Sequence, residues 1–300
     1  MIINEQTLDL VFKGFKTVYT DAYLKADVHW DKIAMSVTSA GASETYGWMG
    51  TFPKLREWVG PRVVKNLAAQ SFTIENIDFE STVSVPRNAI SDDKLGVYKP
   101  SFSEMGHHTS QHPEEMIFRL LANGFDTLCY DGQNFFDTEH PQTDPETGEN
   151  VSVSNMQNGT GPAWFLLDTS RAVRPIVWQE REPYEFQAMT RPDDPNVFFN
   201  NEYVYGIRAR VNAGFGLWQL GYGSKTDLTT ASYAAARAAM MGFKSEEGRV
   251  LGVKPMTMVV PPELEDAALY ILNAPFNESG GSNPWSGTCE LIVTPFLTAS

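Results

Sequence analysis

The amino-acid sequence predicts an α+β fold, because helical and strand-like patterns occupy separate stretches of its 300 residues. Apolar residues recur with helical spacing in residues 4–20 and 98–123, whereas they alternate with polar residues in residues 33–37 and 72–85. Hydrophobic residues make up 42% of the chain and charged residues 20%, so a sizeable core is available. A chain of this length forms one large or two modest domains.

Residues 4–20 (NEQTLDLVFKGFKTVYT) predict an amphipathic N-terminal helix. One helical face carries its apolar residues and must pack against another part of the protein: Leu8, Val11, Phe12, Phe15 and Val18. Residues 33–37 then predict a half-buried strand. Residues 72–85 predict a second strand, in which the alternation slips by one residue near Glu75 and Asn76, as at a bulge or bend.

The segment between these strands, residues 41–71, is long for a connection inside a compact domain. It carries Tyr46, Trp48, Phe52 and Trp58, which are too many aromatic residues for a disordered linker. Exposed aromatic side chains on such a segment are typical of a surface that binds a partner. Packing of the segment back onto its own core is an equally good interpretation.

Residues 98–123 predict a long helix whose apolar residues recur about every 3.5 positions: Tyr98, Phe102, Met105, Met116 and Leu120. Pro113 interrupts the pattern, and Glu114 and Glu115 directly after it suit the first turn of a helix. Asn123-Gly124 predicts the end of the helix. A helix that continues through a kink at Pro113 spans about 39 Å and forms the rigid backbone of its domain.

Residues 141–162 are rich in Pro, Gly, Asn and Thr and predict an exposed loop or a small hairpin. Beyond them the pattern predicts short strands at 164–167, 176–179, 184–189, 202–211, 217–222, 257–260 and 290–294. Helices are predicted at 229–243 and 263–272. Residues 165–300 therefore predict a separate domain of mixed helices and strands.

Charge and composition exclude several function classes. The formal net charge is −14, so the surface repels phosphate backbones, and neither direct nucleic-acid binding nor attraction to anionic membranes is expected. The N-terminus lacks the pattern of a signal peptide, and no apolar run reaches membrane-spanning length. Cys129 and Cys289 lie far apart and form no C-x-x-C pair, which excludes a zinc ribbon or a disulfide framework and favours a reducing cytoplasm as the place of synthesis.

Two other motifs have the wrong spacing for the chemistry that they suggest. His108 and His112 lie four residues apart, as metal-binding pairs on a helix do, but Thr109 stands where a zinc protease needs its glutamate. An exposed or partner-facing histidine cluster is the better interpretation. The glycines of residues 214–223 (GFGLWQLGYG) do not have the spacing of a nucleotide-binding loop, and close strand packing explains them better.

The stretch CYDGQNFFDTEHP, residues 129–141, has the composition of an active site. Cys129 would be a nucleophile if a base and an oxyanion site surrounded it, and His140 is the nearby candidate for the base. Asp137, Glu139 and His140 are possible ligands of a divalent ion. The structural interpretation is favoured, because Asp131-Gly132 is typical of a turn, Phe135-Phe136 suits a core, and His140-Pro141 imposes an extended exit.

Six strings in this order resemble the major head subunit of Mu-type tailed phages and Mu-like prophages. They are YGWMGTFPKLREWVGPR (46–62), DDKLGVY (92–98), CYDGQNFFDTEHP (129–141), LLDTSRAVRPIVWQER (166–181), NNEYVYG (200–206) and LGVKPMTMVVPPELEDAA (251–268). The resemblance extends from about residue 30 to the end of the chain. REWVG and YDGQNFF are its specific parts, whereas the N-terminal helix is weakly diagnostic.

The resemblance implies the Hong Kong 97-type phage capsid fold. Residues 1–32 would then be the N-terminal arm, and residues 33–85 an extended loop with its flanking strands, which lies over a neighbouring subunit. Residues 86–164 would be the peripheral domain, with its spine helix at about 98–123. Residues 165–300 would be the axial domain, whose loops meet around the pentamer and hexamer axes.

The resemblance also implies a function. The family builds an icosahedral shell, the virion head, from hexamers and pentamers around packaged double-stranded DNA in the cytoplasm of a host bacterium, and no catalytic, cofactor or metal residue carries over. Subunit contacts are expected from the aromatic and charged residues of the extended loop: Tyr46, Trp48, Phe52, Lys54, Arg56, Glu57, Trp58 and Arg62. Lys54 and Lys65 lie where some relatives of this fold form covalent cross-links, and we predict that these two do not. A scaffolding protein, a portal and a decoration protein are the implied partners, and scaffold and protease would come from other genes.

Two other functions are compatible with the same residues. An encapsulin-like shell of a cellular compartment would share the fold but enclose an enzyme. A metal-dependent enzyme would use His108, His112 and the Asp137–His140 cluster, and a stoichiometric metal ion would identify it.

Overall fold

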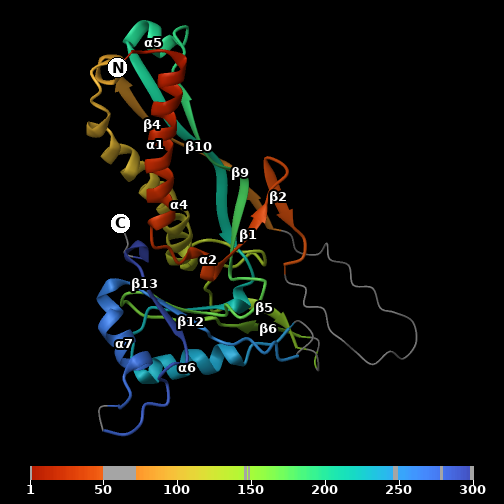
Figure 1. Ribbon diagram of the computed structural model, residues 1–300. Helices are drawn as coiled ribbons and strands as arrows, with labels where there is room; N and C mark the ends of the chain where they lie inside the picture. The colour runs from red at the N-terminus through yellow and green to blue at the C-terminus, as the bar shows by residue number, and fades with distance from the viewer. Residues whose placement is uncertain are drawn as a thin grey trace.

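The computed structural model describes residues 2–49, 72–144, 147, 149–245, 249–277 and 280–297. Figure 1 shows an elongated molecule with a four-stranded sheet and two long helices towards one end and a five-stranded sheet towards the other. Of the two buried apolar clusters, the smaller lies beneath the long helices. The larger surrounds the five-stranded sheet and extends to residues of the four-stranded sheet and of one long helix, among them Trp178, Val211 and Phe118. No helix within the described residues is long and apolar enough to cross a membrane.

The N-terminal helix α1 (Glu5–Lys25) begins where the sequence predicts and runs five residues further. Asn4 caps it, since its side chain accepts a hydrogen bond from the amide of Thr7 at 2.8 Å while Thr7 accepts one from the amide of Asn4. The predicted apolar face is buried: Phe15 stacks on Phe102 with ring centroids 4.1 Å apart. This face contacts the second long helix, α4 (Lys99–Ala122).

The helix α4 continues through Pro113 without a break. Glu114 and Glu115 therefore lie in the middle of a helix. This corrects the prediction that they form the first turn of a helix that begins after Pro113. The helices α1 and α4 approach closely at Gly106, where a side chain would collide with the carbonyl group of Tyr19. Glycine is needed at this crossing because any Cβ atom would force the two helices apart.

The four-stranded sheet has the order β1-β9-β10-β4, and α4 contacts its strands on one face (Figure 1). β1 (Ala34–Thr38) pairs in parallel with β9 (Ile176–Met189), whereas β10 (Glu202–Phe215) is antiparallel to both β9 and β4 (Ile77–Pro86). The short helix α2 (Trp30–Ile33) leads directly into β1. The predicted strands 176–179 and 184–189 are thus one strand, and 202–211 continues four residues further.

The predicted slip at Glu75 and Asn76 is a change of sheet. β3 (Phe72–Glu75) pairs with β2 (Ser43–Tyr46) in a separate two-stranded sheet, and β4 begins directly after Asn76. The loop region 141–162 contains the predicted small hairpin, formed by two strands: β5 (His140–Thr143) and β6 (Asn150–Val153).

The five-stranded sheet has the order β13-β12-β8-β11-β7. Its strands are β7 (Met156–Gln157), β8 (Trp164–Leu167), β11 (Gly221–Ser224), β12 (Thr257–Val260) and β13 (Glu290–Val293). The helices α6 (Thr230–Met241) and α7 (Glu265–Asn273) match the two predicted helices of this part to within a few residues. The predicted strand 217–222 is instead a turn of 3-10 helix, η3 (Trp218–Leu220), followed by β11.

Short elements complete the described chain: α3 (Arg87–Ser91), η1 (Leu95–Val97), η2 (Asn123–Phe125), α5 (Pro195–Asn200), η4 (Pro262–Leu264) and η5 (Pro295–Leu297). We predicted that residues 165–300 form one separate domain. They do not, because β9 and β10 pair with strands from the first hundred residues. Long hairpin strands in this segment reach out of the five-stranded region and complete the other sheet. The other domain boundaries stay predictions.

Candidate assembly surfaces and the 129–141 cluster

Residues 129–141 form a partly buried turn between the end of α4 and the five-stranded sheet. Leu128 and Asn134 bridge the base of the turn, and the amide of Cys129 donates a hydrogen bond to the carbonyl of Gln133 at 2.8 Å. Gly132 has φ +87°, the left-handed conformation that favours glycine at this position. The predicted Asp-Gly turn is therefore present.

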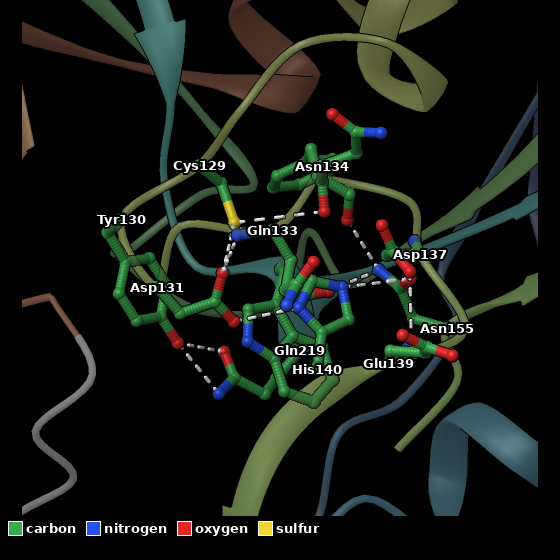
Figure 2. A network of polar contacts seen from close by, with 12 residues as sticks. Cys129, Tyr130, Asp131, Gln133, Asn134, Asp137, Glu139, His140, Asn155 and Gln219 are labelled. Atoms are coloured by element: carbon green, nitrogen blue, oxygen red, sulfur yellow. Dashed lines mark hydrogen bonds and ion pairs between the residues drawn. The ribbon is translucent and has the colours of Figure 1, made fainter. Parts of the chain in front are cut away.

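Polar side chains of this turn interact with one another in the interior (Figure 2). His140 is fully buried, and its Nδ1 lies 2.7 Å from Oδ2 of Asp131, whose side chain is 3% exposed. The thiol of Cys129 donates to Oδ1 of the same carboxylate at 3.1 Å. The imidazole ring stacks on Trp218, with ring centroids 4.0 Å apart and planes 8° apart.

The orientation of Asn155 determines which of its atoms faces the ring of His140. The Asn155 amide nitrogen donates to the backbone carbonyl of Phe135 at 2.8 Å and lies near two further carbonyls, those of Trp218 and Gly221. Its Oδ1 must therefore face Nε2 of His140, 3.2 Å away, which makes that nitrogen a donor. Since Nδ1 faces a carboxylate, both ring nitrogens lie in position to donate a hydrogen bond, one to Asp131 and the other to Asn155.

Electrostatics supports this assignment. Burial opposes ionisation of Asp131, but the hydrogen bonds from His140 and Cys129 outweigh it, so the pKa of Asp131 lies below its ordinary value. Burial, together with the charge of Asp131, raises the pKa of the Cys129 thiol far above its ordinary value. Cys129 is therefore a buried thiol that donates a hydrogen bond, whereas a nucleophile needs an accessible thiolate.

The same three residues are the one group among those described whose donor atoms converge as metal ligands do: Cys129, Asp131 and His140, all within 4.8 Å of one another. These atoms already bind each other through protons, and a protonated thiol and an imidazole whose two nitrogens both face hydrogen-bond acceptors are poor ligands. The predicted alternative set does not come together, because Glu139 is exposed and Asp137 accepts hydrogen bonds from the amides of Thr138 and Glu139. The cluster is best interpreted as structural.

Phe135 and Phe136 pack into the larger core, as predicted. Both are almost completely buried, and Phe135 stacks on Phe215 with ring centroids 4.1 Å apart. Phe136 contacts Phe125 and Phe165. The turn therefore joins the end of the long helix α4 to the five-stranded sheet through both apolar and polar contacts.

The two histidines of α4 have different environments. The His108 side chain is 74% exposed, with Nε2 3.8 Å from Glu104. His112 is half-buried, and its Nδ1 lies 2.6 Å from the hydroxyl of Tyr184. Burial lowers the pKa of His112 and favours the neutral imidazole. Both histidines line a cavity of about 420 Å³ between α4 and the four-stranded sheet.

Two of the expected subunit-contact residues pack onto the core of their own chain. Tyr46 is buried and donates a hydrogen bond through its hydroxyl to Oε1 of Gln179 at 2.8 Å, and burial raises its pKa to about 12. Trp48 is partly buried against the same core and meets Tyr46 edge to face. The remaining expected residues lie outside the described residues: Phe52, Lys54, Arg56, Glu57, Trp58, Arg62 and also Lys65.

An exposed aromatic pair lies elsewhere, on α5, at the end of the long β9–β10 hairpin (Figure 1). Phe198 and Phe199 are 74% and 77% exposed and contact each other edge to face, with centroids 5.1 Å apart. Met189, 43% exposed, ends β9 next to this helix. We call these three residues the hairpin tip. Sequence reasoning missed the hairpin tip, although the two adjacent phenylalanines after Asp-Asp-Pro-Asn-Val are an apolar signal in a polar turn.

Comparison with known proteins now decides the family. The family model described as "Mu-like prophage major head subunit gpT" matches residues 8–297. The chain belongs to this family. The major capsid protein of Escherichia phage Mu is 40% identical over 305 residues, covering 99% of this chain and all of the relative. The Mu-like prophage FluMu major head subunit of Haemophilus influenzae is 37% identical over 284 residues, covering 92% of each chain.

Solved structures agree with this family. A chain from the procapsid of bacteriophage JBD30 is 42% identical, superposes with a TM-score of 0.87, and covers 98% of this head subunit and 100% of that chain. A chain from the JBD30 capsid is 32% identical with a TM-score of 0.78, covering 93% and 94%. The predicted α+β phage capsid fold of the Hong Kong 97 type is thereby confirmed, and the protein is a structural head subunit.

Proposed function

We propose that this head subunit assembles with copies of itself, through pentamers and hexamers, into an icosahedral shell that encloses double-stranded DNA. The observation that carries the proposal is the match to a JBD30 procapsid chain over 98% of this chain at 42% identity. The structure of the 129–141 cluster supports a structural role, because its polar groups are buried and bind each other. The net charge of −14 suits a container within which DNA must move.

Contacts between subunits would come from the aromatic and basic residues of the extended loop, above all Trp58, with Arg56 and Arg62 setting the register. Tyr46 and Trp48 would instead fix the base of this loop, because they pack on their own core. Each contact is modest, but a closed shell repeats it many times and so holds the lattice cooperatively. Lys54 and Lys65 would form no covalent cross-link, so the shell would dissociate into single chains on a denaturing gel.

Further partners follow from the same proposal. A scaffolding protein and a portal would take part in assembly, which would occur in the cytoplasm of the host bacterium. A JBD30 capsid structure carries minor capsid protein trimers as decoration, and its subunit is 33% identical to this chain with a TM-score of 0.77. A decoration protein of that kind would bind the outside of this shell. The packaged DNA would be held without sequence-specific contacts.

Electron microscopy of the purified protein tests the proposal. We expect closed shells of uniform diameter, together with free pentamers and hexamers. Trp58→Ala should impair shell formation while leaving the subunit folded, and Val63→Ala in the same segment is the matched control. A protein that stays a monodisperse monomer under every assembly condition would refute the proposal. Normal assembly of Trp58→Ala would refute only the role of Trp58.

A further inference from the structure

A buried carboxylate in the middle of α4 binds the chain where the N-terminal arm joins the four-stranded sheet. Glu114 is 5% exposed, and its Oε2 accepts hydrogen bonds from the backbone amides of His29 and Trp30, both at 2.8 Å. Its Oε1 lies 3.5 Å from Nδ1 of His29. Among the buried side chains described, Glu114 is the one glutamate, so its charge is unusual for its position.

The segment that Glu114 binds connects two separately anchored parts of the chain. On its N-terminal side, α1 packs on α4 through the Phe15–Phe102 stack. On its C-terminal side, β1 pairs with β9, and Lys32 of α2 forms an ion pair with Glu290 of β13 at 2.6 Å. The amides of His29 and Trp30 lie between these attachments. Any movement of the arm relative to the sheet must therefore change the hydrogen bonds to Glu114.

A glutamine at this position would have the same shape and retain an acceptor oxygen for both amides. The charge of glutamate adds a desolvation cost that a neutral acceptor does not have. Burial raises the pKa of Glu114 above its ordinary value, although the hydrogen bonds from His29 and Trp30 oppose the shift. Burial thus disfavours the charged form of Glu114, although this form accepts the stronger hydrogen bonds from the two amides.

His29 is the titratable group that acts on Glu114 among the residues described. On α4 itself, His112 and Glu115 line the cavity that faces the sheet. On the arm segment, Asp27 and Asp31 are exposed, and Lys32 is engaged by Glu290. The pH dependence of this contact is therefore assigned to Glu114.

We propose that Glu114 is a positioning residue that anchors the N-terminal arm through its hydrogen bonds to the amides of His29 and Trp30, and that this anchor weakens between acidic and neutral pH. Its importance for shell assembly rests on the proposed function, whereas the anchor itself is a property of the single subunit. The sign of the pH effect follows from linkage. Because the pKa of Glu114 is raised in the folded protein, its contribution favours the docked arm at low pH and is lost as pH rises through that pKa.

Hydrogen exchange of unassembled subunits measures the anchor directly. Glu114→Leu removes the oxygen that accepts from both amides, so amides of residues 26–33 should exchange at least about tenfold faster at neutral pH, equivalent to about 1.4 kcal/mol. Glu114→Gln should exchange more slowly than the wild type at neutral pH. Its protection factors should also vary less than those of the wild type between about pH 4 and pH 8, a range that begins near the ordinary glutamate pKa and extends well above it. Normalisation to intrinsic exchange rates removes the trivial effect of pH.

Glu115→Gln is the matched control, because Glu115 is the adjacent residue of α4 and forms a more exposed ion pair with Arg119 at 2.8 Å. Its exchange and its pH profile should equal those of the wild type. The proposal is overturned if Glu114→Gln also behaves as the wild type across the pH range, since a purely structural role predicts that result. Shell formation by the same variants is measured separately. If the wild type failed to assemble, the proposed function would be refuted, but the hydrogen-exchange result would still decide whether Glu114 anchors the arm.

Discussion

Two segments of this head subunit depart from the usual distribution of polar and apolar residues in opposite directions. Residues 129–141 carry a thiol, an acid and a histidine, yet these groups are buried and bind each other. The hairpin tip carries Phe198 and Phe199, yet both are exposed to solvent. In this protein, the residues with potentially reactive side chains therefore lie in the interior, whereas the candidate contact surface, the hairpin tip, is apolar.

The difference shows that residue type alone does not locate a functional site. A buried polar group stabilises a fold when each of its donors and acceptors is paired, and it then contributes to a unique arrangement of the chain. An exposed aromatic pair has no such role within one subunit, and in a protein that assembles it is typical of a contact with another chain. Burial and pairing, which only the folded structure supplies, distinguish the two cases.

Removal of the His140 side chain from the buried cluster should have the largest effect. His140→Ala leaves the Asp131 carboxylate buried without its partner and creates a cavity beside Trp218, so we expect the free energy of unfolding to fall by about 3–5 kcal/mol. Chemical denaturation of the unassembled subunit measures this change. His108→Ala is the control, since that side chain is 74% exposed, and it should change stability by less than about 0.5 kcal/mol. Equal stability of both variants would contradict the buried contact between His140 and Asp131.

The sequence predicted much of this cluster but not its central residue. Asp131-Gly132 and Phe135-Phe136 have local signals, a turn and a core pair, and both predictions are confirmed. Asn155 was not predicted, because its role depends on the carbonyls of Phe135, Trp218 and Gly221, which only the tertiary fold brings together. A single asparagine in a polar loop carries no signal of such a role.

Loss of the hairpin tip should affect assembly and leave the subunit intact. We expect the double variant Phe198→Ser, Phe199→Ser to change the free energy of unfolding by less than about 0.5 kcal/mol, because both side chains are exposed. The concentration needed for shell formation should rise by about tenfold, or about 1.4 kcal/mol per contact, measured by light scattering. Leu24→Ser is the control, since Leu24 is 73% exposed but stands alone on α1. Unchanged assembly of the double variant would exclude the tip as a contact.

Long elements were predictable where the pattern persisted over many residues, and contacts between distant segments were not. The helices α1 and α4 follow from their apolar spacing, but the continuity of α4 through Pro113 depends on packing against α1 and the sheet. The prediction of a separate domain from residue 165 was wrong, because β9 pairs with β1. A strand pattern in the sequence does not show which other strand it pairs with. Tyr46 was assigned to a partner surface or to its own core, and its hydrogen bond to Gln179 favours the core.

The smallest expected effect comes from comparing two buried tyrosines, one with a hydrogen-bonded hydroxyl and one without. Tyr205 is fully buried beneath α1, yet its hydroxyl has no hydrogen-bond partner in the described part of the chain. Tyr205→Phe removes an unpaired polar group, so the free energy of unfolding should stay equal or rise by up to about 1 kcal/mol. Tyr46→Phe is the matched control: it removes a hydroxyl that donates to Gln179 at 2.8 Å and should lower that free energy by about 1 kcal/mol. The denaturation curve of Tyr46→Phe should thus shift to lower stability, whereas that of Tyr205→Phe should stay at or above the stability of the wild type. If Tyr205→Phe lost as much stability as Tyr46→Phe, the Tyr205 hydroxyl would have a hydrogen-bond partner in solution. The two tyrosines would then not differ in hydrogen bonding.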